Sequence, residues 1–64
     1  METYEAAINE AAKIYAEGNV IGASAEALIR LDEELCLMRD QIAEKFDRGR
    51  QMVYYDIEKA AEAL

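Results

Sequence analysis

Several residue types that build functional sites are missing, or nearly so, from these 64 residues. The sequence contains no histidine, no proline and no tryptophan, and its single cysteine is Cys36. One cysteine cannot form an intramolecular disulfide, and without histidine the usual zinc and di-iron sites lack their ligands. Nucleophilic catalysis would also lack its usual histidine base. We therefore expect no cofactor, no metal site and no enzymatic activity.

Long apolar runs and an excess of positive charge are missing as well. No run approaches the roughly 18 residues that a membrane span needs, and the opening METYEAAINE is acidic and amphipathic, unlike a signal peptide. The chain has 14 acidic and 7 basic residues, for a net charge of −7. Because nucleic acids and anionic membranes bind basic surfaces, we expect neither as a direct partner. A lone cysteine fits a reducing compartment, so we expect a cytoplasmic protein.

The abundant residues favour helices. Hydrophobic residues make up 53% of the chain, and Ala, Glu, Leu, Ile, Arg and Lys dominate; most of these are good helix formers. We predict an all-α protein with a single small helical domain over residues 1–64. A chain of this length buries only about 60% of the surface that its unfolded form exposes, so its core is marginal without a disulfide, a metal or a second chain. Of these three sources of stability, the composition still permits self-association.

The first helix is predicted over about residues 3–17. Thr3 is suited to cap its start with a hydroxyl oxygen, and Gly18 suits the left-handed residue that often follows a helix. Apolar residues recur at helical spacing between these limits, at Tyr4, Ile8, Ala11 and Tyr15.

The turn that follows contains two branched apolar residues, Val20 and Ile21. The turn has about six residues, a usual length between antiparallel helices. These two side chains either fold over the end of the helix pair as an apolar plug or form an exposed contact for a partner. Both alternatives stay open.

The second helix is predicted over about residues 24–47, with Ser24 as its N-cap. An apolar seam with alternating steps of three and four residues runs along it, as in a coiled coil, and consists of Leu28, Leu31, Leu35, Met38 and Ile42. Further apolar residues stand outside this seam, at Ile29, Cys36 and Leu37. This surplus indicates that the helix touches more than one neighbour.

The seam fails within FDRGRQ, where Gly49 takes a seam position. The apolar set resumes on a shifted stripe, at Phe46, Val53, Ile57, Ala60 and Leu64. Such a shift indicates either a kinked long helix or a break into a separate helix. The prediction is therefore a helical hairpin with a kinked or separate C-terminal helical segment over about residues 50–63, completed as a dimeric helical bundle.

Charged residues offer little chemistry beyond solvation and local pairing. Adjacent acids such as those of LDEEL diverge by about 100° on a helix and do not converge on one ion. A continuous helix would pair Glu44 with Arg48 and Asp47 with Arg50. The opposite side of the second helix from its seam carries an acid in every heptad, and the acidic face consists of Glu26, Glu33, Asp40, Glu44 and Asp47.

Two functions are consistent with these observations. The first is a small acidic protein–protein interaction module, such as an adaptor, chaperone, inhibitor or regulatory subunit, that acts as a homodimer or with another protein. Tyr54 and Tyr55 fall on adjacent faces, where one packs and the other can anchor a contact. The predicted interface residues are Val20, Ile21, Ile29, Cys36, Leu37, Tyr54 and Tyr55.

The alternative function is an acidic mimic of nucleic acid that blocks a DNA- or RNA-binding protein. Its surface would be the acidic face, whose carboxylates repeat about every 10.5 Å along a helix. Interspersed basic residues such as Arg30 and Arg39 weaken this imitation of a phosphate row.

Overall fold

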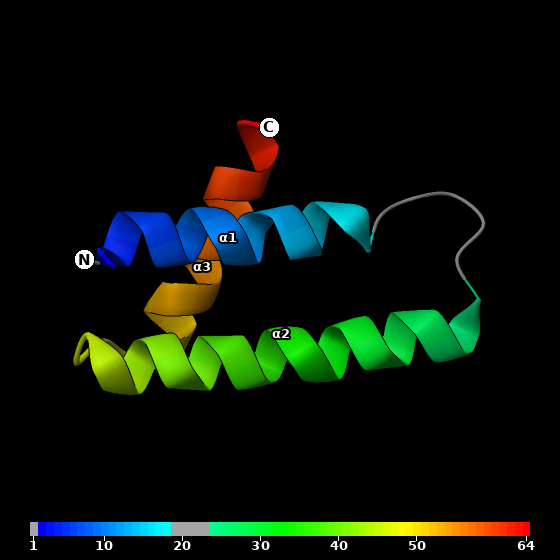
Figure 1. Ribbon diagram of the computed structural model, residues 1–64, viewed down its shortest axis with the longest axis horizontal. Coiled ribbons are helices and arrows are strands. Elements are labelled where there is room, and N and C mark those ends of the chain that lie inside the picture. Colours follow the sequence, from blue (N-terminus) through cyan, green and yellow to red (C-terminus); the bar gives the residue numbers. More distant parts are fainter. Residues whose placement is uncertain (1, 19–23) are drawn as a thin grey trace.

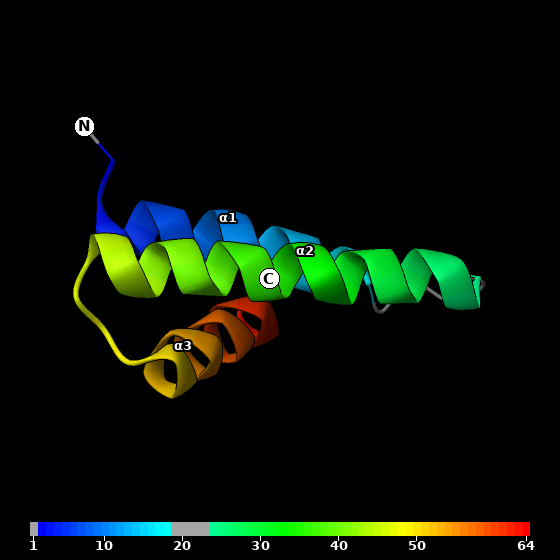
Figure 2. The same cartoon turned by 90° about the horizontal axis from the view of Figure 1, so that it is seen from below.

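A computed structural model describes residues 2–18 and 24–64, which form three α-helices (Figure 1). The helices are α1 (Tyr4–Glu17), α2 (Ala25–Lys45) and α3 (Arg50–Glu62). The predicted all-α hairpin with a C-terminal segment is confirmed, and that segment is a separate helix. Its completion by a second chain stays a prediction. The helices α1 and α2 lie side by side, and α3 crosses beneath them (Figure 2).

Hydroxyl caps fix where the first two helices begin. The Thr3 side-chain oxygen accepts a hydrogen bond from the Ala6 backbone N–H at 3.1 Å. The Ser24 hydroxyl accepts one from the Ala27 N–H at 3.2 Å. Each bond satisfies a backbone donor that the helix itself leaves free, which is worth about 1 kcal/mol. Both predicted caps are therefore confirmed.

The predicted left-handed conformation of Gly18 is wrong. Gly18 has φ −64° and ψ −17°, which is right-handed, and its N–H donates to the Ile14 carbonyl at 3.2 Å. The last turn of α1 thus continues through this residue. A β-carbon placed on Gly18 would lie 3.5 Å from the Leu31 side chain, so the two helices approach closely here.

The chain breaks between α2 and α3. Asp47 adopts a left-handed φ of 53°, the Arg48 N–H donates to the Ala43 carbonyl at 2.9 Å, and the Asp47 N–H contacts the Glu44 carbonyl at 3.4 Å. This pair of bonds is a Schellman motif, which ends a helix. Gly49 then opens α3 with an extended backbone. The alternative of a kinked, continuous helix is thereby eliminated.

The hydrophobic core gathers at one end of the molecule, where α3 crosses the other two helices (Figure 2). Val53 and Ile57 are its largest fully buried side chains, at 0% and 1% exposure. The alanines of α1 let α3 approach closely, and Ala11 is fully buried. The core consists of Ala7, Ile8, Ala11, Ile42, Ala43, Val53 and Ile57.

The other end of α2 extends beyond α3 (Figures 1 and 2). The 21 residues of α2 span about 31 Å, whereas α3 covers only the half near Ile42. As a result the predicted seam is uneven: Leu35 is 8% exposed but Leu28 is 45% exposed. None of the three described helices is long and apolar enough to cross a membrane.

Candidate interaction site

Two neighbouring depressions lie where the uncovered part of α1 and α2 meets the side of α3. Together they are termed the trough. Both are lined by Tyr15, whose ring packs edge-on against Tyr54 with 6.3 Å between ring centroids. Residues of all three helices line the trough, namely Tyr15, Ala16, Gly18, Leu28, Leu31, Asp32, Leu35, Tyr54, Glu58, Ala61 and Glu62.

The helix lengths explain why the trough exists. The seam of α2 is apolar for its whole length, but α3 has only 13 residues and crosses near the far end. Leu28 and Leu31 therefore face the space beside α3 and not its core side chains, and Leu31 is only partly buried. The result is an apolar floor supplied by α1 and α2, with α3 as one wall.

Carboxylates border this apolar floor. Asp32, Glu58 and Glu62 line the trough, and its lining includes no lysine or arginine among the described residues. None of the three carboxylates forms an ion pair within residues 2–18 and 24–64. The pKa of Tyr54 is raised, first by burial and then by the neighbouring Tyr15, Glu58 and Asp32. The trough therefore has a negative potential over an apolar surface.

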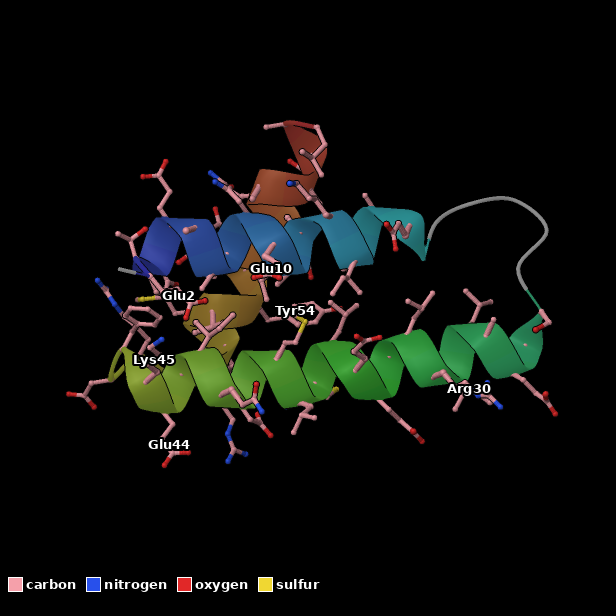
Figure 3. All side chains as sticks on the ribbon, in the orientation of Figure 1. Glu2, Glu10, Arg30, Glu44, Lys45 and Tyr54 are labelled. Carbon is pink, nitrogen blue, oxygen red and sulfur yellow. The ribbon has the colours of Figure 1, made fainter. Side chains whose placement is uncertain are left out.

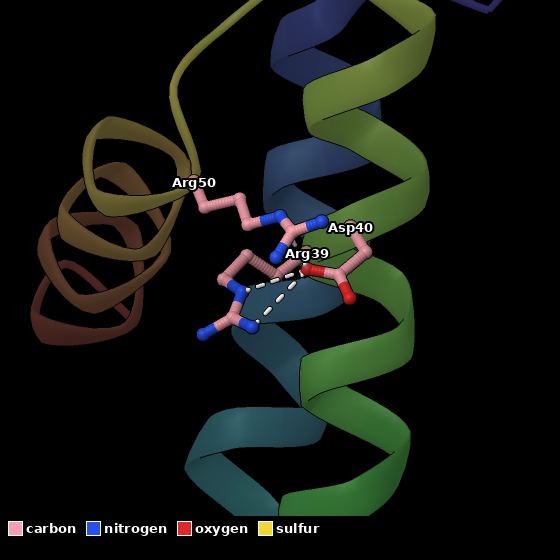
Figure 4. Close-up of polar contacts among 3 residues, drawn as sticks. All are labelled: Arg39, Asp40 and Arg50. Carbon is pink, nitrogen blue, oxygen red and sulfur yellow. Dashed lines mark hydrogen bonds and ion pairs between the residues drawn. The ribbon is translucent and has the colours of Figure 1, made fainter.

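Basic side chains gather instead at the corner between α2 and α3. Asp40 accepts hydrogen bonds from Arg39 at 3.1 and 3.2 Å through one carboxylate oxygen, and Arg50 at the start of α3 reaches the same oxygen at 3.3 Å (Figure 4). The expected pairs of a continuous helix, such as Asp47 with Arg50, are replaced by this cluster because the chain breaks after α2.

Three further cations are also engaged. Lys45 lies 2.6 Å from Glu2, which joins the end of α2 to the residues before α1 (Figure 3). The Arg48 guanidinium lies over the Tyr4 ring at 5.1 Å, and the Lys59 ammonium lies 5.2 Å from the Tyr55 ring centroid. Five of the seven cations are thus engaged by local partners, whereas the lining of the trough includes carboxylates and no cation.

The predicted interface residues of α2 lie in different environments. Ile29 and Leu37 are each 59% exposed, and Cys36 is partly buried. Leu37 follows Leu28 by nine residues, which is two and a half turns, so it lies on the opposite side of α2 from the trough. Its helical neighbours there are charged residues such as Glu33 and Arg30, and Figure 3 shows Arg30 pointing away from α1. Leu37 is therefore an isolated apolar side chain on a polar face.

Tyr54 and Tyr55 lie in different environments, as expected for tyrosines on adjacent faces of a helix. Tyr54 is partly buried against Tyr15, whereas Tyr55 is 56% exposed. Of these two tyrosines, only Tyr54 lines the trough.

Val20 and Ile21 lie outside the described residues. The two alternatives for them, an apolar plug or an exposed contact, therefore stay predictions.

The acidic face is less regular than its sequence spacing indicates. Glu26, Glu33 and Glu44 are exposed on α2, and Glu44 points away from α1 (Figure 3). Asp40, in contrast, is occupied by two arginines. Asp47 lies beyond the end of α2, in the turn.

The sequence places Leu28 and Leu31 in the seam of the second helix and Tyr15 on the apolar stripe of the first, but it does not indicate that they line a trough. A signal for this was available in the predicted lengths. A third segment of about 14 residues cannot cover a second helix of about 24 residues along its full length. Which part of the second helix stays uncovered depends on where the third helix crosses it.

Within residues 2–18 and 24–64 there is no group of three or more acidic or cysteine side chains placed to hold a metal ion. No protein family, no curated protein and no solved structure matches this chain. The chemistry of the described residues is therefore the basis for assigning a function.

Proposed function

We propose that the protein is a small acidic helical interaction module of the adaptor, chaperone, inhibitor or regulatory-subunit kind. The trough carries the contact, and its occupant is a second copy of the chain or another protein. The observation that supports this is the apolar floor left open beside α3, where Leu28 keeps 45% of its surface exposed. Apolar residues that adjoin one another at a surface commonly mark protein contacts.

The small size of the core gives the same proposal a thermodynamic basis. A domain of 64 residues is marginally stable, and the core is confined to one end of α2. Covering the trough would remove Leu28 and Leu31 from water, at roughly 25 cal/mol per Å² of apolar surface buried. Any partner that binds the folded state alone also stabilises that state by mass action.

Site-specific photo-crosslinking tests this proposal. Benzoylphenylalanine placed at position 28 lies in the trough, and the same residue at position 37 lies on the opposite side of α2. In the cells that produce the protein, we expect a covalent protein adduct at position 28 and none at position 37. Equal adducts at both positions, or none at either, would contradict the proposal.

Sedimentation equilibrium of the purified chain distinguishes the two kinds of occupant. A dimer mass that Leu28→Lys converts to a monomer mass, and that Leu37→Lys leaves unchanged, identifies a second copy. A monomer that nevertheless gives the position-28 adduct in cells identifies another protein.

The alternative, an acidic mimic of nucleic acid, has narrower support. Glu26, Glu33 and Glu44 are exposed along one side of α2, but the pairing of Asp40 with two arginines shortens the row. Binding through such a row should fall steeply with added salt. Charge reversal at Glu33 and Glu44 that left binding to a nucleic-acid-binding target intact would eliminate this alternative.

A further inference from the structure

The charge and shape of the trough indicate which kind of partner fits it. We propose that the occupant is a cationic amphipathic α-helix of another protein, which lies alongside α3. Its apolar face covers Leu28 and Leu31, and its lysines or arginines lie beside Asp32 and Glu58. This inference rests on the proposed function and adds the chemistry of the partner.

The shape argument follows from how α3 itself is held. The underside of the α1–α2 pair accepts α3 through Val53 and Ile57, and it continues past α3 as the floor of the trough. A second helix on that floor would pack beside α3 and meet its Tyr54 side. Helices that lie in apolar grooves use anchors spaced at i, i+3 or i+4 and i+7. A helix that lies alongside the whole of α3 would have roughly 13 residues and a length of about 20 Å.

The charge argument selects a cationic helix. The three carboxylates of the trough, Asp32, Glu58 and Glu62, have no ion-pair partner among the described residues. A helix with basic residues flanking its apolar face would supply three such partners at once. An acidic or neutral helix would leave the carboxylates unpaired and partly desolvated, which costs free energy.

The same argument disfavours a second copy of this chain. Each copy has a net charge of −7, so two copies repel each other. Five of its seven cations are already engaged by Asp40, by Glu2 and by tyrosine rings. A second copy would have to break these contacts before it could offer those five to the trough, which leaves only Lys13 and Arg30 outside them.

Two synthetic peptides of about 14 residues test the proposal. One has leucines at helical spacing with lysines at the remaining positions, and the other has glutamates in place of the lysines. We expect the lysine peptide to bind the purified, full-length protein at least about tenfold more tightly than the glutamate peptide. Its affinity should fall as NaCl is raised from about 50 to about 500 mM. Isothermal titration calorimetry measures both.

Matched variants show whether binding occurs in the trough. Leu28→Lys should weaken binding of the lysine peptide at least about tenfold, whereas Leu37→Lys adds the same charge on the opposite side and should leave affinity within about twofold. The pair Asp32→Asn with Glu58→Gln should weaken binding about tenfold. The pair Glu33→Gln with Glu44→Gln removes the same net charge and serves as its control. Circular dichroism verifies that each variant is folded.

The outcomes separate this inference from the function on which it rests. No binding of the lysine peptide, equal binding of both peptides, or equal effects of trough and control variants would overturn the inference. A position-28 adduct in cells together with any of these results would leave the interaction module standing with a different partner. Absence of the position-28 adduct would instead remove the proposed function.

Discussion

Asp47 occupies a backbone conformation that most side chains avoid. Its φ of 53° is left-handed, and this conformation costs a residue with a β-carbon roughly 1–2 kcal/mol, less for Asp and Asn than for others. Glycine is the usual residue at this position of a Schellman motif because it has no β-carbon. The sequence places glycine two residues later, where Gly49 begins α3 with an ordinary extended backbone.

Replacing Asp47 by glycine should therefore stabilise the protein. We expect Asp47→Gly to raise the free energy of unfolding by about 0.5–1 kcal/mol, after the greater freedom of glycine in the unfolded chain is subtracted. Urea unfolding followed by circular dichroism measures this change. Asp47→Val should lower stability, because a branched side chain fits this conformation poorly. A lower stability for the glycine variant would contradict the assigned strain.

Tyr4 connects the start of α1 to α3 through a hydrogen bond that its hydroxyl donates to Asp56. Burial, foremost, and this hydrogen bond raise the pKa of Tyr4 from 10.0 to about 12. The folded protein thus holds this proton more tightly than the unfolded chain does. The resulting stabilisation is present below pH 10 and is lost as the pH rises from about 10 to about 12.

Tyr4→Phe should remove this pH dependence. At neutral pH we expect the variant to be less stable by about 1 kcal/mol, which is the usual worth of one hydrogen bond. The difference between wild type and variant should then shrink between about pH 10 and pH 12. Urea unfolding at a series of pH values measures it, and the subtraction removes the titration that both proteins share. A difference that stays constant across this range would show that Tyr4 is not the responsible group.

At the scale of the helices, the half of α2 near Ile42 packs in the hydrophobic core, whereas the half near Leu28 extends beyond it. We expect Ile57→Ala, which removes a fully buried contact of α3 with the core, to cost about 2–5 kcal/mol. On a domain of this size that loss amounts to unfolding. Leu28→Ala in the trough should cost less than about 1 kcal/mol, because Leu28 is already 45% exposed. Chemical denaturation and circular dichroism compare the two variants, and similar losses would contradict the uneven core.

Local rules predicted the helices well because their signals lie within a few residues. Thr3 and Ser24 cap the helices as expected, and the shifted stripe through Val53 and Ile57 is the core face of α3. The break at Asp47 was one of two open alternatives, because glycine is tolerated within a helix at about 1 kcal/mol. Only the tertiary contacts of α3 decide between them.

The candidate site could not be predicted in the same way, because it depends on where α3 crosses α2. The seam from Leu28 to Ile42 is uniform in sequence, yet only its second half meets α3. The Asp40 cluster likewise joins residues whose pairing requires the turn at Asp47. Gly18 shows the same limit. The sequence predicts a left-handed residue there, whereas in the structure Gly18 lies where α1 closely approaches Leu31 of α2.

At the scale of the whole molecule, the distribution of charge sets the response to salt. The net charge is −7, and the ion pairs among the described residues involve partly or largely exposed side chains, so each contributes little. Repulsion between carboxylates should therefore outweigh these pairs. Raising NaCl from about 20 to about 300 mM should increase the free energy of unfolding by roughly 1 kcal/mol. Thermal unfolding at several salt concentrations tests this, and a falling midpoint would show that the ion pairs dominate.

Because α2 extends beyond α3, the backbone amide hydrogens of this one helix should exchange with solvent at different rates along its length. Amide hydrogens near Ile42 are released only when the core opens, whereas those near Leu28 are released by fraying of a few turns. Hydrogen exchange should therefore quicken steadily toward Ala25. A ligand in the trough would have to suppress this fraying, so part of its intrinsic affinity would be spent on ordering the helix end. Slower exchange near Leu28 would then report occupancy of the trough before any complex structure is known.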